Sequence, residues 1–215
     1  MKKVLQIICI NILISNFSYS QSQDSEKNVI KYFDQNYSPL TQKEFENIRR
    51  TNKFLDIQGD SINHKVLLVR EEQGTIQNKE TFDLMLSSAS NNKIDSSKPI
   101  VIIYYPGKDW CNSSGSATRR TVRKSFNKME KGINKIKKST IIYIYKDAVG
   151  LYGKNDGFKE WIQDPGNHIE RLFFQHHYSC SSFVVISSRG DYISYFGEFS
   201  KVLVLKAVTT ITSFK

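Results

Sequence analysis

The residue best suited to chemistry is a cysteine that lies between an apolar run and a predicted helix. Residues 99–105 read P-I-V-I-I-Y-Y, and Pro106 ends this β-branched and aromatic run. Such a run predicts a strand that is buried on both faces of an α/β sheet. Cys111 follows it, ahead of an amphipathic helix that we expect to begin around residues 114–117. In the turn before a helix, unpaired N–H groups and the helix dipole favour the reactive thiolate.

A second cysteine is expected in the same compartment as the first. The chain begins with a pair of lysines and an apolar run over residues 4–13, a pattern typical of a secretory signal. We therefore expect residues 1–20 to be cleaved from an exported protein, periplasmic or secreted, because the run is too short for a membrane span. Cys9 would leave with this segment. Cys111 and Cys180 would then remain where disulfides persist.

The elements that would position Cys111 alternate between strand and helix. Apolar residues spaced four and three apart predict a helix up to about residue 138, and they are Val122, Phe126, Met129, Ile133 and Ile136. Further strands are expected at 139–145, 182–186 and 192–196, and helical segments at 158–163, 168–175 and 201–212. In the second of these helical segments, Ile169, Leu172 and Phe173 are expected to point inward. The order predicts an α/β sheet with a crossover helix and an antiparallel edge.

The preceding residues predict an N-terminal α+β extension over 21–96, ahead of a domain over 97–215. In the extension, Thr41 and Glu44 have the spacing of a capping box at the start of a helix. We expect helices at 28–37, 41–50 and 80–87, extended segments at 53–57 and 65–70, and a turn at 71–74.

The charge of the chain is concentrated in the long helix. The formal net charge is +10, and residues 119–138 hold nine basic residues against Glu130 alone. A basic face can attract nucleic acid or anionic membranes. Because the chain has no recognisable nucleic-acid module and is expected to be exported, we interpret this helix as a solvated face and expect no nucleic-acid partner.

The motifs resemble those of the thioredoxin-like superfamily, in particular its exported TlpA-type redoxins and the neighbouring peroxiredoxins. A strand leads into Trp110-Cys111-Asn112-Ser113-Ser114, and Cys180-Ser181-Ser182 with F-V-V precedes a Gly-Asp hairpin. The resemblance covers about residues 97–200. It implies a thioredoxin-like three-layer sandwich with a mixed central sheet, no cofactor, and protein thiols, disulfides or a small oxidant as partners.

Two departures from the family pattern bear on the chemistry. The family motif is W-C-x-x-C, whereas this chain has W-C-x-x-S, so Ser114 stands in place of the second thiol. A dithiol oxidoreductase needs a second thiol to resolve its mixed disulfide. Where the family has a proline before its last hairpin, this chain has Cys180 or Ser181. Since the family packs that loop against the active-site turn, the resemblance implies that Cys180 can approach Cys111.

Three states of these two cysteines stay open: a reversible redox pair, a fixed structural bridge, or two unlinked thiols. The resemblance implies catalytic roles for Cys111 and Cys180, and substrate contacts for Trp110, Ser114 and Ser181. The predicted function is thiol–disulfide exchange or peroxide chemistry, with a catalytically lapsed binding module as the alternative. His176 and His177, together with the cysteines, are candidate ligands for a soft metal. Because adjacent histidines are usually surface residues, no metal site is expected.

Overall fold

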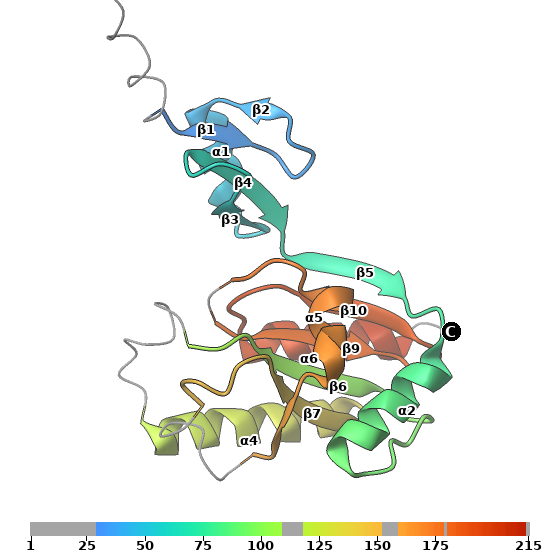
Figure 1. The fold of residues 1–215 in the computed structure, drawn as a ribbon. Helices are drawn as coiled ribbons and strands as arrows, with labels where there is room; N and C mark the ends of the chain where they lie inside the picture. Colours follow the sequence, from blue (N-terminus) through green and yellow to red (C-terminus); the bar gives the residue numbers. More distant parts are fainter. Residues whose placement is uncertain (1–28, 109–117, 152–158, 179, 214–215) are drawn as a thin grey trace, which may run out of the picture.

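The computed structural model describes residues 29–108, 118–151, 159–178 and 180–213, which form a mixed α/β fold with two sheets (Figure 1). The larger sheet has six strands in the order β5-β10-β9-β6-β7-β8. Its strands are β5 (Glu71–Thr75), β6 (Ile100–Tyr105), β7 (Thr140–Tyr145), β8 (Trp161–Gln163), β9 (Ser182–Ile186) and β10 (Asp191–Tyr195). Strand β7 is parallel to β6, whereas β9 is antiparallel to it.

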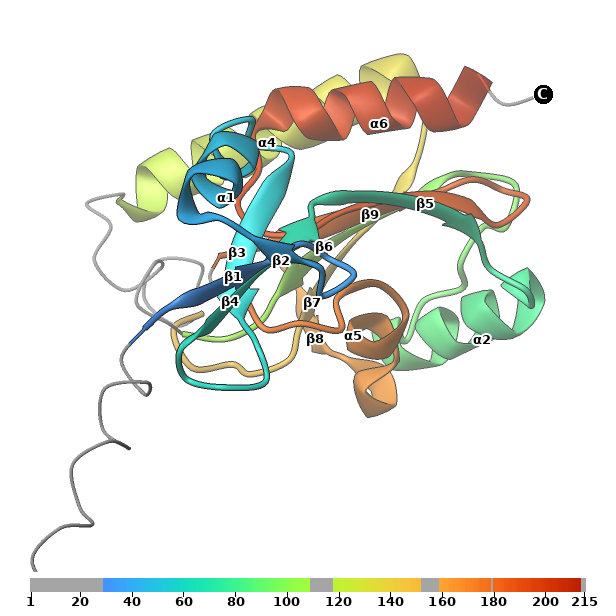
Figure 2. The same ribbon diagram turned by 90° about the horizontal axis from the view of Figure 1, so that it is seen from above.

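Helices cover both faces of this sheet, as Figure 2 shows. On one face lie α4 (Arg119–Ile136) and α6 (Lys201–Ser213), and on the other lie α2 (Lys79–Ser90) and α5 (His168–Phe173), which follows the short 3-10 turn η1 (Pro165–Asn167). Each face has its own hydrophobic core, with Met129 and Val204 on the first and Phe82 and Ile169 on the second. Strands β6 and β9 are buried along their whole length because both of their faces are covered.

A smaller four-stranded sheet lies N-terminal to the larger one. Its order is β2-β1-β4-β3, and β1 runs parallel to β4. Its elements are β1 (Lys31–Phe33), β2 (Pro39–Leu40), α1 (Gln42–Arg49), β3 (Phe54–Gln58) and β4 (His64–Val69). Helix α1 contributes Phe45, which is 1% exposed and contacts Tyr32 with ring centroids 4.8 Å apart. No helix of the described residues is long and apolar enough to span a bilayer.

Most of the predicted elements are confirmed. The buried strand at 99–105, the strands at 139–145 and 182–186, and the terminal helix are all present. The capping box is also confirmed, because the Glu44 N–H donates to the Thr41 hydroxyl and the Thr41 N–H donates to the Glu44 carboxylate. The hairpin β9–β10 is antiparallel and β9 is antiparallel to β6, as predicted, although β5 rather than β10 forms the edge of the sheet.

Three short segments differ from prediction because tertiary pairing gives them a strand conformation. Residues 28–37 were expected to be helical but contain β1, and 158–163 contain the edge strand β8. Residues 71–74 were expected to turn but form β5, which pairs with β10 in the larger sheet. The division after residue 96 stays a prediction, although β5 and α2 lie before it and pack with the larger sheet.

One detail of the predicted helices is corrected and another lies outside the described residues. Helix α4 begins at Arg119, with the Thr118 hydroxyl accepting the N–H of Thr121 as its N-cap, and the residues 114–117 at which a helix start was predicted are not described. Leu172 was expected to point inward but is 49% exposed, because a six-residue helix turns only Ile169 and Phe173 toward the core.

A buried arginine joins the two sheets where β4 continues into β5. Arg70 is 5% exposed, and its guanidinium donates to the carbonyl oxygens of Phe196 and Glu198 and to the side-chain oxygen of Asn52. It also lies 4.6 Å from the ring centroid of Tyr195, a cation–π distance. The backbone N–H of Phe196 in turn donates to the carbonyl of Arg70 at 2.7 Å. One side chain therefore fixes the smaller sheet to the end of β10.

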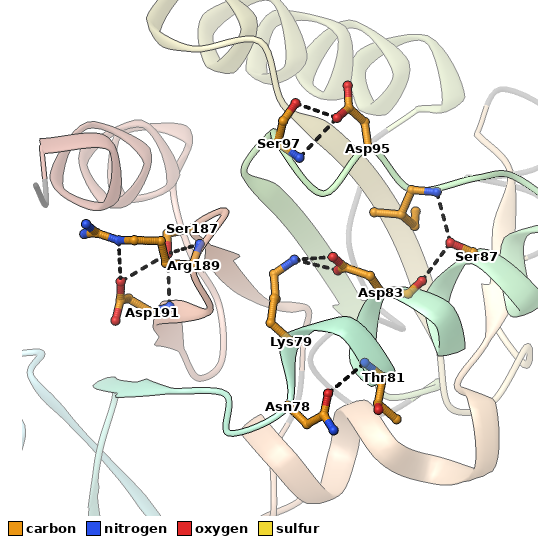
Figure 3. Close-up of polar contacts among 11 residues, drawn as sticks. Asn78, Lys79, Thr81, Asp83, Ser87, Asp95, Ser97, Ser187, Arg189 and Asp191 are labelled. Atoms are coloured by element: carbon orange, nitrogen blue, oxygen red, sulfur yellow. Dashed lines mark hydrogen bonds and ion pairs between the residues drawn. The ribbon is translucent and has the colours of Figure 1, made fainter.

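Helix α2 is tied to the β9–β10 hairpin, and Figure 3 shows the polar contacts within the helix region and within the hairpin turn. The Asn78 side chain caps α2 by accepting the N–H of Thr81 at 3.0 Å. The ammonium of Lys79, the first residue of α2, donates to both carboxylate oxygens of Asp83 one turn further on, at 2.6 Å. These two side chains are only 13% and 9% exposed. The hairpin is bonded to the segment just before α2, because the Ile76 N–H donates to the carbonyl oxygen of Gly190 at 2.9 Å.

We expect Arg70→Met to lower the free energy of unfolding by about 2–4 kcal/mol, because it leaves buried carbonyl oxygens without donors. Urea unfolding followed by circular dichroism measures this change. Arg189→Met is the control, since Arg189 is 54% exposed and its removal should shift the curve far less. Equal effects of the two substitutions would show that Arg70 does not secure the junction.

Asp83→Asn is expected to cost about 3 kcal/mol of stability, because it leaves the Lys79 ammonium buried without its counter-ion. The double variant Lys79→Met with Asp83→Leu should recover most of that loss, since it removes both charges. Thermal unfolding of the three proteins measures the difference. In the exposed pair of Asp95 with Lys98, Asp95→Asn should leave the midpoint nearly unchanged. A double variant as unstable as the single one would contradict this account.

Candidate functional site

Among the described residues, Cys180 has the side chain best suited to covalent chemistry. It lies two residues before β9, is partly buried, and is disulfide-bonded. The sulfur to which it is bonded lies outside the described residues. The chemistry at this position is therefore that of a disulfide, and a disulfide sulfur is an electrophile toward an incoming thiolate.

The segment that carries Cys180 is held in place by the sheet. The N-terminal end of β9 pairs with the C-terminal end of β6, with Phe183 opposite Ile103 and Ser182 opposite Tyr104. The Ser182 hydroxyl, 3% exposed, accepts the N–H of Gly197 at 2.9 Å. This bond connects the cysteine segment to the loop between β10 and α6, so both segments approach the same end of the sheet.

Cys180 borders a pocket of about 190 Å³ at this end of the sheet. Helix α4 forms one wall with Ser125, Phe126 and Met129. The other wall belongs to the loop before α6 and the first residue of that helix, with Glu198, Phe199 and Lys201, and Ser181 lies beside the cysteine. The pocket thus combines a disulfide sulfur with three apolar side chains and a polar margin.

The two walls are anchored in aromatic packing. Phe126 contacts Tyr143 edge-on at a centroid distance of 5.3 Å, and Tyr143 lies 5.2 Å from Trp161. The Tyr143 hydroxyl donates to Glu130 at 2.7 Å, and burial, followed by this hydrogen bond, raises the pKa of Tyr143. On the opposite wall Phe199 contacts Phe183 edge-on at 4.9 Å. The pocket is therefore largely preformed.

The backbone at Cys180 has an unusual conformation. Its φ is +73°, in the left-handed region that residues with a Cβ rarely adopt. Holding such a residue there costs about 1–2 kcal/mol, which the surrounding sheet must offset. Strained positions of this kind cluster at functional sites. The conformation and the disulfide thus coincide at one residue on the edge of a pocket.

The structure brings together two of the predicted site residues and does not describe the others. Cys180 and Ser181 line the same pocket. Trp110, Cys111 and Ser114 lie outside the described residues. Sequence reasoning missed other side chains that line the pocket, among them Phe126, Met129, Phe199 and Lys201. Phe126 and Met129 belong to an apolar stripe that predicts core residues, and both lie in the middle of the helix, so the sequence carries no signal of a second role.

The candidate metal ligands do not gather in the described part of the chain. His176 lines a different cavity of about 200 Å³ beside Arg70 and Phe174, and its ring packs near Phe196 with centroids 6.5 Å apart. His177 is exposed. Among the described residues, histidine, cysteine and carboxylate side chains form no group of three that could bind a metal ion. The second cavity has neither a thiol nor a disulfide in its described lining, so the Cys180 pocket is the stronger candidate site.

Comparison with known proteins gives little similarity. No protein-family model matches the chain, and no curated protein matches it. Among solved structures, the chain is similar to the exposed lipoprotein thioredoxin Etrx1 from Streptococcus pneumoniae strain TIGR4. The two are 12% identical, the match covers 58% of this chain and 89% of that chain, and the TM-score is 0.37. A score of this size carries no argument about function.

Proposed function

We propose that this chain is an exported thioredoxin-like protein that exchanges disulfides with polypeptide thiols through a reversible Cys111–Cys180 bond. The observation that carries the proposal is the disulfide at Cys180 on the margin of an apolar pocket. The chain has three cysteines, and Cys9 belongs to the predicted signal segment. Cys111 is then the partner that an exported, processed chain retains.

The order of the elements supports this pairing. Residue 111 lies in the connection between β6, which ends at Tyr105, and α4, which begins at Arg119. The end of β6 is paired with the start of β9, and α4 forms a wall of the pocket that Cys180 borders. Both elements that flank residue 111 in the sequence therefore approach Cys180. A disulfide requires Cα atoms within about 7 Å, which a connection between these two elements can provide.

Because position 114 is a serine, the role of resolving thiol falls to Cys180. A mixed disulfide at Cys111 has no neighbouring thiol in the W-C-x-x-S sequence to resolve it. Cys180 supplies that thiol from the start of β9 instead. The left-handed backbone of Cys180 is local strain of the kind that clusters at functional sites, which supports a functional role for this residue.

The electrons and protons of the exchange balance between the substrate and the cysteine pair. A substrate thiolate attacks one sulfur of the pair, forms a mixed disulfide and releases the other cysteine as a thiolate, which takes up a proton. A second substrate thiolate then attacks the mixed disulfide, so the substrate acquires the disulfide and the protein retains both cysteines as thiols. Two electrons and two protons pass from the substrate to the protein. The reverse sequence reduces a substrate disulfide.

A redox titration tests this function. We expect the Cys111–Cys180 bond to open and close reversibly with a midpoint potential above about −300 mV, because fixed structural disulfides lie below that value. Protein equilibrated in glutathione or dithiothreitol buffers is alkylated, and the modified cysteines are identified by mass spectrometry. Exchange with a dithiol peptide should be lost in both Cys111→Ser and Cys180→Ser and retained in the control Ser61→Ala, at an exposed serine between β3 and β4.

Other outcomes would replace the proposal. A midpoint potential below about −300 mV would identify a structural bridge in a binding module. If Cys180 remains inaccessible to alkylation in Cys111→Ser, the two cysteines are not partners. A thiol at Cys111 that reacts with peroxide but not with dithiol peptides would favour a peroxidase instead.

A further inference from the structure

Helix α4 carries a row of basic residues, and two of them, Arg123 and Lys128, are helical neighbours of residues that line the disulfide pocket. The helix bears Arg119, Arg120, Arg123, Lys124, Lys128, Lys131 and Lys135, with Glu130 as its one acidic residue. Glu130 does not offset them, because its carboxylate accepts from the Tyr143 hydroxyl at 2.7 Å and pairs with Lys159 at 2.5 Å. Within the described residues, no carboxylate lies within ion-pair distance of Arg123 or Lys128.

The cations nearest the pocket flank its apolar wall. Arg123 lies three residues before Phe126, and Lys128 lies three residues after Ser125, so each is a helical neighbour of a pocket residue. Both are exposed. Lys201 lines the opposite wall, where Glu198 is the acidic member. The margin is therefore positive overall, with cations on both sides of the opening.

The pocket has the size of a subsite for one side chain. Its volume of about 190 Å³ is below the roughly 300–1,000 Å³ typical of sites that enclose a small molecule. Phe126, Met129 and Phe199 give it an apolar interior beside Cys180. Methionine adapts to differently shaped apolar side chains, so this interior can accept more than one residue type.

We infer that the partner of this pocket is an acidic polypeptide segment, which inserts one apolar side chain between α4 and the loop before α6 while its carboxylates contact Arg123, Lys128 and Lys201. The binding step does not depend on the thiol chemistry, but the identification of this partner as the substrate rests on the proposed function. A membrane fits less well, because the large apolar side chains of α4 face the protein, with Ile136 at its far end as the exception at 40% exposure.

Fluorescence anisotropy tests the inference. The probes are two labelled short peptides without cysteine, one with a leucine flanked by glutamates and one with the same leucine flanked by lysines. We expect the acidic peptide to bind at least about tenfold more tightly, with an affinity that falls as salt is added. The double variant Arg123→Glu with Lys128→Glu should weaken binding about tenfold or more.

A matched variant locates the effect. Lys135→Glu with Lys138→Glu makes the same change in net charge at the far end of the helix and should alter the affinity by less than about twofold. Replacing the leucine of the acidic peptide with serine should also weaken binding, because the pocket then stays unfilled. Equal loss in the two double variants, or no preference between the peptides, would overturn the inference. Preferential binding to anionic vesicles or to DNA, reduced equally in both variants, would do the same.

The proposed function and this inference fail separately. Selective binding of the acidic peptide that persists in Cys111→Ser with Cys180→Ser, in a protein whose disulfide titrates as a fixed bridge, would retain the binding site and reject the exchange. Reversible exchange with equal rates for acidic and basic dithiol peptides would retain the exchange and reject the charge selectivity.

Discussion

The antiparallel pairing of β9 with β6 is the constraint on which the site depends. Both strands are buried along their whole length, so their register is set by helices packed on both faces rather than by one amphipathic face. This register places the start of β9 beside the end of β6. Cys180 is thereby fixed at the edge where the connection to α4 leaves the sheet, and the Ser182–Gly197 hydrogen bond brings the loop before α6 to the same place.

The same end of the sheet also carries the joint with the N-terminal unit. Arg70 hydrogen-bonds to the carbonyls of Phe196 and Glu198, and Glu198 is also a wall residue of the pocket. A buried guanidinium can satisfy several carbonyl oxygens at once because it presents five donors in a fixed plane. The loop between β10 and α6 is therefore held from two sides: by β9 through Ser182 and by the smaller sheet through Arg70. The described residues of the smaller sheet thus contribute to the rigidity of the pocket, although none of them is in its lining.

The fold changes the interpretation of the charge pattern of α4. As a sequence, a helix with a clean apolar stripe and basic residues elsewhere is most simply a solvated cover for a sheet. In the structure, Met129 is both a core residue and a pocket residue, and Glu130 is already occupied by Tyr143 and Lys159. Of the exposed cations on α4, Arg123 and Lys128 then lie beside residues of the pocket wall, so their position along the helix matters as well as their number.

The sequence by itself determined the elements whose own residues carry the signal: the buried run at 99–105, the amphipathic helix with Met129 and Ile133, and the capping box of α1. The tertiary structure alone decided the short edge strands, because β5 and β8 obtain their backbone hydrogen bonds from β10 and β7, far from them in sequence. For the same reason the pocket could not be predicted beyond Cys180 and Ser181. Its walls come from three separate segments, and only packing brings Phe126 and Phe199 to one disulfide.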